Sequence, residues 1–112
     1  VYSGITEAIN QFHPEIMAIE DIFYGKNVQS LIKQGHVRGV AVLAAAQAGL
    51  EIFEYSPLEI KKAVSGYGFA EKKQVQMMVK NILRLVELPP SDAADALAAA
   101  ICHIHFLKTE QV

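Results

Sequence analysis

Cysteine and long apolar runs are both scarce in this sequence of 112 residues. Cys102 is the only cysteine, so neither an internal disulfide nor a site built from several thiolates can form. The longest apolar runs, 40–46 and 96–102, have seven residues each, whereas a membrane-spanning helix needs about 20. These absences exclude a spanning helix. Since no signal-peptide pattern opens the sequence, we expect a cytoplasmic protein.

The sequence also lacks a large net charge, because 10 basic and 12 acidic side chains leave a formal charge of only −2. With 52% hydrophobic residues, the chain is predicted to form one globular domain over residues 1–112. Basic residues nevertheless gather in one stretch, against a single acid: Lys61, Lys62, Lys72, Lys73, Lys80 and Arg84. This strip could meet a polyanion, although the last three residues also fit a solvated helix face.

The apolar periodicity predicts an alternation of helices and strands. A helix ends near residue 12, a mostly buried strand covers 15–23, a long helix covers 27–48 and a second strand covers 50–55. Ser56 and Pro57 open a third helix, which Gly66 closes. An amphipathic helix with apolar positions through Val86 follows, and a final helix covers 91–106. This order predicts an α/β layered fold with two parallel strands.

Three acids stand in apolar surroundings. Glu20 lies near the carboxyl end of the first predicted strand, where ligands of open α/β sheets bind. Asp92 and Asp95 are three apart at the head of an Ala-rich helix, so both could offer oxygens to one cation. The alternative for the pair is capping, with Ser91 as N-cap and acids facing the helix dipole. Capping does not explain Glu20.

Other candidate residues allow two interpretations each. Gly35 and Gly39 lie one turn apart in the long helix, where close packing against another helix would compensate for their low helix propensity. Phe23 could end the core of the first strand, or stack on an unpaired base at a loop tip. His103 lies about 12 Å along its helix from Asp95, which is too far for a shared metal ion. His13, His36 and Cys102 are predicted to be packing or surface residues.

Taken together, five segments resemble the RuvC family of Holliday-junction resolvases in order and spacing: AIEDIFYGKN (18–27), QGHVRGVAVLAAA (34–46), FEYSPLEIKKAVSGYG (53–68), AEKKQVQ (70–76) and DAADALAAAICHIH (92–105). The resemblance implies the carboxyl-terminal part of a ribonuclease H-like fold. It also implies a homodimer that cuts two strands of a four-way DNA junction with a divalent metal, normally Mg²⁺, with Mn²⁺ also possible. A branch-migration complex is the further partner implied.

The resemblance also implies roles for individual positions. Glu20, Asp92 and Asp95 are similar to catalytic, metal-binding acids, although some members carry histidine at the position of Asp92. Phe23 is similar to an aromatic residue that contacts bases at the junction centre. Lys61 and Lys72 are similar to basic residues that line the DNA cleft of the family. The helix that carries Gly35 and Gly39 is similar to the helix through which the two subunits pair.

One departure from the family pattern affects the expected activity. The first catalytic aspartate of the family belongs to a Gly-Ile-Asp-Pro-Gly type segment, and no such segment occurs in this sequence. We therefore expect that a piece is missing upstream and that these residues alone have little or no nuclease activity. Two alternatives stay open: a non-catalytic dimerisation or DNA-binding module, and a ribonuclease H-like enzyme acting on another nucleic acid.

Overall fold

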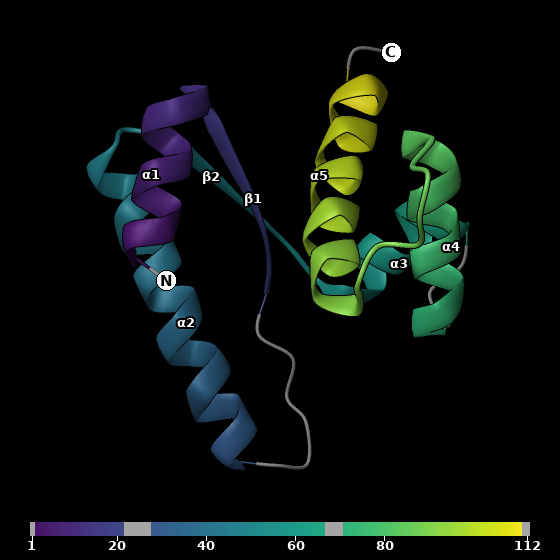
Figure 1. The fold of residues 1–112 in the computed structure, drawn as a ribbon, viewed down its shortest axis with the longest axis horizontal. Coiled ribbons are helices and arrows are strands. Elements are labelled where there is room, and N and C mark those ends of the chain that lie inside the picture. Colours follow the sequence, from purple (N-terminus) through teal and green to yellow (C-terminus); the bar gives the residue numbers. More distant parts are fainter. Residues whose placement is uncertain (1, 22–27, 67–70, 111–112) are drawn as a thin grey trace. The chain divides into compact units, whose positions relative to one another are not determined.

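The computed structural model of the chain describes residues 2–21, 28–66 and 71–110 (Figure 1). Its elements follow the predicted order and confirm an α/β arrangement. They are α1 (Tyr2–Phe12), β1 (Ile16–Glu20), α2 (Val28–Gln47), β2 (Glu51–Tyr55), α3 (Pro57–Ser65), α4 (Lys72–Leu83) and α5 (Ser91–Glu110). No helix in these described ranges is long and apolar enough to cross a bilayer. Asn27, the first residue of the helix predicted over 27–48, lies outside the described residues.

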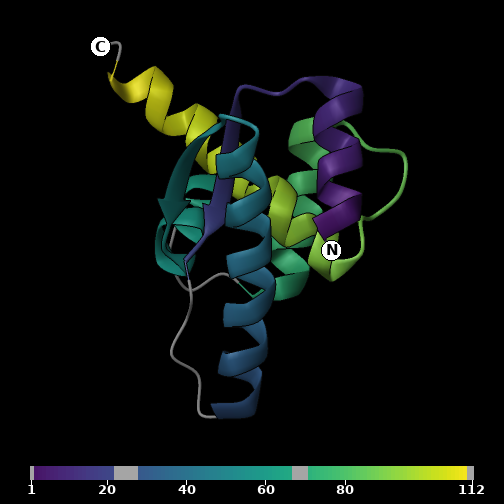
Figure 2. The same cartoon turned by 90° about the vertical axis from the view of Figure 1, so that its left-hand side faces the viewer.

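The two strands pair in parallel, as predicted. Near the start of the pairing, the Glu51 N–H donates to the Glu15 carbonyl over 3.2 Å, and at its end the Asp21 N–H donates to the Tyr55 carbonyl over 2.8 Å. Figure 2 shows the two arrows side by side, pointing the same way. The prediction that β1 is mostly buried is wrong, because its central residues are only half-buried and its ends are exposed. The strand is also shorter than predicted and ends at Glu20, where its last carboxylate stays accessible.

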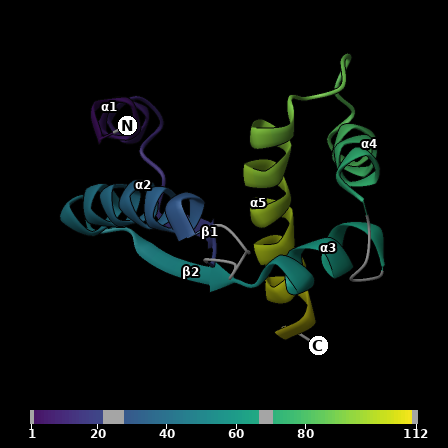
Figure 3. The same ribbon diagram turned by 90° about the horizontal axis from the view of Figure 1, so that it is seen from below.

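The chain divides into two compact units, 1–17 with 22–53 and 18–21 with 54–112. In the first unit, α1 packs against α2 (Figure 3), and the Tyr2 hydroxyl donates to Oε1 of Gln47. Among the side chains of α2 that the structure describes, the buried ones are small: Ala41, Ala44 and Ala45. Gly49 follows the end of α2 with a φ of 79°, a conformation that favours glycine.

The second unit is built from three helices and the ends of both strands. Helix α5 packs against α3 and α4, which also contact each other; Figure 1 shows α4 beside α5. The buried core of this unit includes the aromatic ring of Tyr55 together with small and branched side chains: Ile60, Val64, Val75, Val79, Ala94, Ala98, Ala99 and Cys102. Since the alanines of α5 are buried, the helix axes can approach closely.

Local sequence signals set most of the helix ends in this unit. Ser56 and Glu59 form a reciprocal capping box at the start of α3, and Gly66 closes that helix with a φ of 89°. Helix α4 ends at Leu83, earlier than the predicted pattern through Val86, because Arg84 takes a left-handed conformation at φ 55°. Val86 is 94% exposed and therefore does not continue the apolar face.

Candidate acidic functional site

Glu20 and Asp95 interact in the second unit, although they are far apart in the sequence. Partial burial raises the pKa of Glu20, and the negative charge of Asp95 raises that pKa further. β1 places Glu20 at its carboxyl end, next to the backbone hydrogen bond between Asp21 and Tyr55. Asp95 is half-buried in the second turn of α5. The fold therefore brings a strand carboxylate and a helix carboxylate into one electrostatic environment.

Asp92 joins this environment through Asp95. Burial raises the pKa of Asp95, the charge of Lys72 lowers it, and the charge of Asp92 raises it again. Asp92 lies in the first turn of α5, where the helix dipole also favours a negative charge. Ser91 is not the predicted N-cap, because it is the first residue of the helix and its buried hydroxyl has no hydrogen-bond partner in the described part of the chain.

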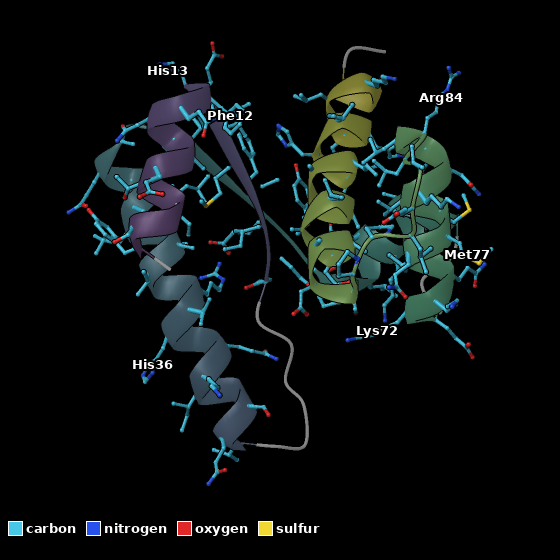
Figure 4. All side chains as sticks on the ribbon, in the orientation of Figure 1. Phe12, His13, His36, Lys72, Met77 and Arg84 are labelled. Carbon is cyan, nitrogen blue, oxygen red and sulfur yellow. The ribbon has the colours of Figure 1, made fainter. Side chains whose placement is uncertain are left out.

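Two lysines of the predicted basic strip act on both acids. The positive charges of Lys61 and Lys72 lower the pKa of Glu20 and of Asp95. Lys61 is half-buried on α3, and Lys72 is exposed at the first turn of α4. Figure 4 shows Arg84 at the opposite end of α4 from Lys72, and Met77 pointing away from α5. The strip is therefore not uniform, and two of its members stand out by their effect on the acids.

The acids fit a hard divalent cation in chemistry and charge. Carboxylate oxygens are the ligands that Mg²⁺ and Mn²⁺ prefer. Burial and, to a smaller extent, repulsion between acids raise the pKa of Glu20 and Asp95, and a bound cation would offset that repulsion. In the residues that the structure describes, however, no group of three or more His, Cys, Asp or Glu side chains stands close enough to hold one ion. The structure thus places the three acids in one neighbourhood without assembling a three-ligand site.

The remaining residues singled out in the sequence do not belong to the group of acids and lysines. Phe23 lies outside the described residues. Gly35 and Gly39 lie on α2 in the first unit, and a Cβ at Gly39 would meet no atom within 4 Å in the part of the chain that the structure describes. His13 and His36 are exposed in that same unit (Figure 4). Cys102 is buried, and burial raises the pKa of its thiol to about 11, so this thiol is a poor nucleophile at neutral pH.

Sequence reasoning missed the environment of His103. This side chain is 6% exposed, and its Nδ1 lies 2.6 Å from the hydroxyl oxygen of Tyr55 at the end of β2. The distance from Asp95 along α5 excludes His103 as a metal ligand, but no local pattern indicates a hydrogen-bond partner for it. The available signal was a histidine on the same face of α5 as the apolar positions that pack inward.

Glu20→Gln is expected to stabilise the folded chain at neutral pH. Because the folded-state pKa of Glu20 is raised above its ordinary value of 4.5, the folded state holds this proton more tightly than the unfolded state. Stability is then lost as the pH rises from 4.5 through the raised pKa, and the full penalty is present above it. Much of the side chain is exposed, so we expect a gain below about 1 kcal/mol in metal-free buffer.

Urea denaturation near pH 7 and near pH 4 would measure this gain, which should shrink at the lower pH because both states are then largely protonated. Glu51→Gln in β2 is the control, since that exposed side chain is an equivalent carboxylate outside the acidic site. A gain of equal size for both variants, or one independent of pH, would contradict the electrostatic explanation.

The sequence that forms this site matches a known protein family. The family model described as "Crossover junction endodeoxyribonuclease RuvC" matches residues 1–103 of the chain. The chain belongs to the RuvC family. This match spans both compact units and includes every acid and lysine of the site.

Individual RuvC proteins agree with this assignment. The chain is 54% identical over 106 residues to RuvC of Caldanaerobacter subterraneus subsp. tengcongensis, covering 94% of this chain and 64% of that protein. For RuvC of Pseudoalteromonas translucida the identity is 56%, over 94% of this chain and 60% of that protein. The chain thus spans less than two thirds of the length of these relatives.

A solved structure confirms the fold of the family. The structure described as "T. thermophilus RuvC in complex with Holliday junction substrate" matches with a TM-score of 0.88 and 35% identity, covering 97% of this chain and 67% of that one. A second structure of Thermus thermophilus RuvC matches with a TM-score of 0.85. The RuvC resemblance and the partial fold predicted from sequence are therefore confirmed.

Proposed function

We propose that this chain carries the greater part of the active site of a metal-dependent endonuclease that resolves four-way DNA junctions. The observation that carries the proposal is the charge coupling of Glu20 and Asp95 with Lys61 and Lys72, within a chain that belongs to the RuvC family. The structure of a related protein contains a Holliday junction substrate, as its description states. Because the family match spans both units, we treat residues 1–112 as part of one resolvase domain.

In the proposed reaction, phosphodiester hydrolysis, the acids and lysines have opposite tasks. Glu20, Asp92 and Asp95 would hold Mg²⁺ or Mn²⁺, which when bound promotes ionisation of the attacking water and offsets charge on the departing oxygen. Lys61 and Lys72 would neutralise the phosphates on either side of the cleaved bond. The same lysines act against the upward shift that burial and neighbouring acids give the pKa of Glu20 and Asp95.

Cleavage of a synthetic four-way junction tests this function. The test protein is a chimera in which residues 1–112 replace the matching 64% of the Caldanaerobacter relative, so that the remaining part supplies the acid that the resemblance implies. We expect the chimera to cut the junction in Mg²⁺ and not in EDTA. The 112-residue chain alone should bind without cutting, because the resemblance implies a fourth acid.

Two results would contradict the proposal or its parts. Binding without cleavage by the chimera would favour the alternative, a non-catalytic module of the same fold. Magnesium-dependent cleavage by the 112-residue chain at ordinary turnover would show that its three acids suffice. A cytoplasmic location and a branch-migration complex as partner remain predictions from the resemblance.

We further propose that α2 pairs two copies of the chain. Ile32 and Leu43 are 53% and 51% exposed, and Gly39 lies between them on the same face of the helix. A Cβ at Gly39 meets no atom of the described residues within 4 Å, so packing among those residues does not explain this glycine. A second copy of α2 could approach closely here, as the family resemblance implies for Gly35 and Gly39.

Gly39→Leu is expected to shift the chain from dimer to monomer, because the added side chain would separate the two helices. The substitution favours helix formation by roughly 1 kcal/mol, so unfolding of α2 would not explain the shift. Sedimentation velocity across a concentration series measures the change. Gly4→Leu is the control, since Gly4 also lies in a helix with open space around it. Equal dimerisation of both variants, or a monomeric parent chain, would contradict the proposed interface.

A further inference from the structure

Tyr55 is connected through its backbone to the chain segment that carries Glu20. It is the last residue of β2, and its carbonyl accepts the Asp21 N–H over 2.8 Å. Asp21 directly follows Glu20, so this hydrogen bond holds the backbone at the point where β1 ends. Any displacement of Tyr55 is therefore transmitted to the strand end that presents the Glu20 carboxylate.

Through its side chain, Tyr55 is connected to α5. Its hydroxyl oxygen lies 2.6 Å from Nδ1 of His103, and the two residues are only 8% and 6% exposed. Its ring also stacks on Phe106, with ring centroids 5.2 Å apart and planes at 23°. One buried residue thus contacts β1 through its backbone and α5 through its side chain.

The same part of α5 is also held by α3. The Cys102 thiol lies 3.7 Å from the carbonyl oxygen of Glu59, and Glu59 precedes Lys61 by half a turn on α3. Asp95 stands about 12 Å along α5 from His103. Between them, Ala98 and Ala99 are buried against the neighbouring elements. Because an intact helix behaves as a rigid rod over this distance, fixing residues 102 and 103 also fixes the position of Asp95.

We propose that Tyr55 and His103 are positioning residues that set the distance between Glu20 at the end of β1 and the acids of α5. A stack on Phe106 alone would let α5 slide along the ring, whereas a buried hydrogen bond of 2.6 Å fixes both distance and direction. Phenylalanine at position 55 would keep the stack without requiring a buried polar partner. The pair therefore contributes a geometric restraint, and this inference rests on the proposed function of the acids.

Tyr55→Phe in the chimera tests the restraint, because it removes only the hydroxyl. We expect the single-turnover cleavage rate at saturating Mg²⁺ to fall about tenfold or more, since small misplacements of reacting groups have large effects on rate. Junction affinity should stay within about twofold, because the lysines are untouched. Mn²⁺ titration followed by electron paramagnetic resonance should show binding weakened by about fivefold, a readout independent of cleavage.

Substitutions at His103 separate a specific hydrogen bond from general packing. His103→Leu should match Tyr55→Phe, and the double variant should be no slower than either single variant, because both remove the same interaction. His103→Gln retains a group that can hydrogen-bond to the Tyr55 hydroxyl and should recover most of the rate. Tyr2→Phe is the control, since it removes a hydroxyl hydrogen bond to Gln47 in the first unit.

The outcomes distinguish this inference from the function on which it rests. If the unsubstituted chimera does not cleave in Mg²⁺, the proposed function fails. If it cleaves and Tyr55→Phe matches it in both rate and Mn²⁺ affinity, the positioning role is overturned while the function stands. A parallel loss of cleavage, junction affinity and thermal stability would also overturn the positioning role, because it would indicate a purely structural contact.

Discussion

Asp95→Asn in the chimera is expected to lower junction cleavage by at least about 1,000-fold. The substitution keeps the shape of the side chain and removes the charge that couples Asp95 to Glu20. A 1,000-fold loss corresponds to about 4 kcal/mol of transition-state stabilisation, within the several kcal/mol that a bound divalent ion supplies to phosphoryl chemistry. Binding should be no weaker than in the parent, because an acid near the phosphates repels DNA. Single-turnover cleavage and equilibrium binding measure the two effects separately.

Glu71→Gln is the matched control for this loss. Glu71 is an exposed carboxylate that precedes Lys72, and its side chain forms no capping hydrogen bond to α4. Its replacement should leave cleavage unchanged. If Asp95→Asn cut the junction at the parent rate, the assignment of the acidic site would fail.

Removing Lys61 and Lys72 together is expected to weaken junction binding by roughly 10- to 100-fold at 150 mM salt. Each lysine that neutralises a phosphate releases about one counterion, so the slope of log affinity against log salt should become shallower by about 0.9 per lysine. Both lysines also lower the pKa of Glu20 and Asp95. Fluorescence anisotropy over a salt series measures the slope directly.

Lys62 and Lys73 are matched controls, because they are the immediate neighbours of Lys61 and Lys72 on α3 and α4. Both are exposed, and the lysine charges that act most on the pKa of Glu20 and Asp95 are those of Lys61 and Lys72. Removing this second pair subtracts the same total charge. If both double variants changed affinity and salt slope equally, DNA would be sensing only net charge, and the proposed cleft would be contradicted.

Local signals in the sequence predicted many of the element boundaries. The capping box of Ser56 and Glu59 and the left-handed closure at Gly66 involve contacts within a few residues, so the order of residue types is enough to specify them. The end of α4 was not predictable in this way, because Arg84 takes a conformation usually signalled by glycine. Ser91 was wrongly predicted as an N-cap, because α5 begins at Ser91 itself and the Ser91 hydroxyl has no hydrogen-bond partner in the described residues.

For the candidate site, too, the sequence predicted some features and could not predict others. Glu20 stood out in sequence as a carboxylate at the end of an apolar strand, and the family resemblance selected Asp92, Asp95, Lys61 and Lys72. Spacing could not show that Asp95 acts on Glu20 through its charge. It also could not separate Lys61 and Lys72 from the other basic residues. The hydrogen bond between Tyr55 and His103 had no counterpart in any local pattern.

The sequence by itself therefore determined the family, the order of helices and strands, and the kinds of residue available for chemistry. These properties depend on residue type and on interactions between near neighbours in the chain. Only the tertiary structure decided which charges act on one another and how β2 connects the end of β1 to α5. The physical reason is that electrostatic interaction and burial depend on distance in space, which for Glu20 and Asp95 is set by the packing of α3, α4 and α5 and by the pairing of two strands.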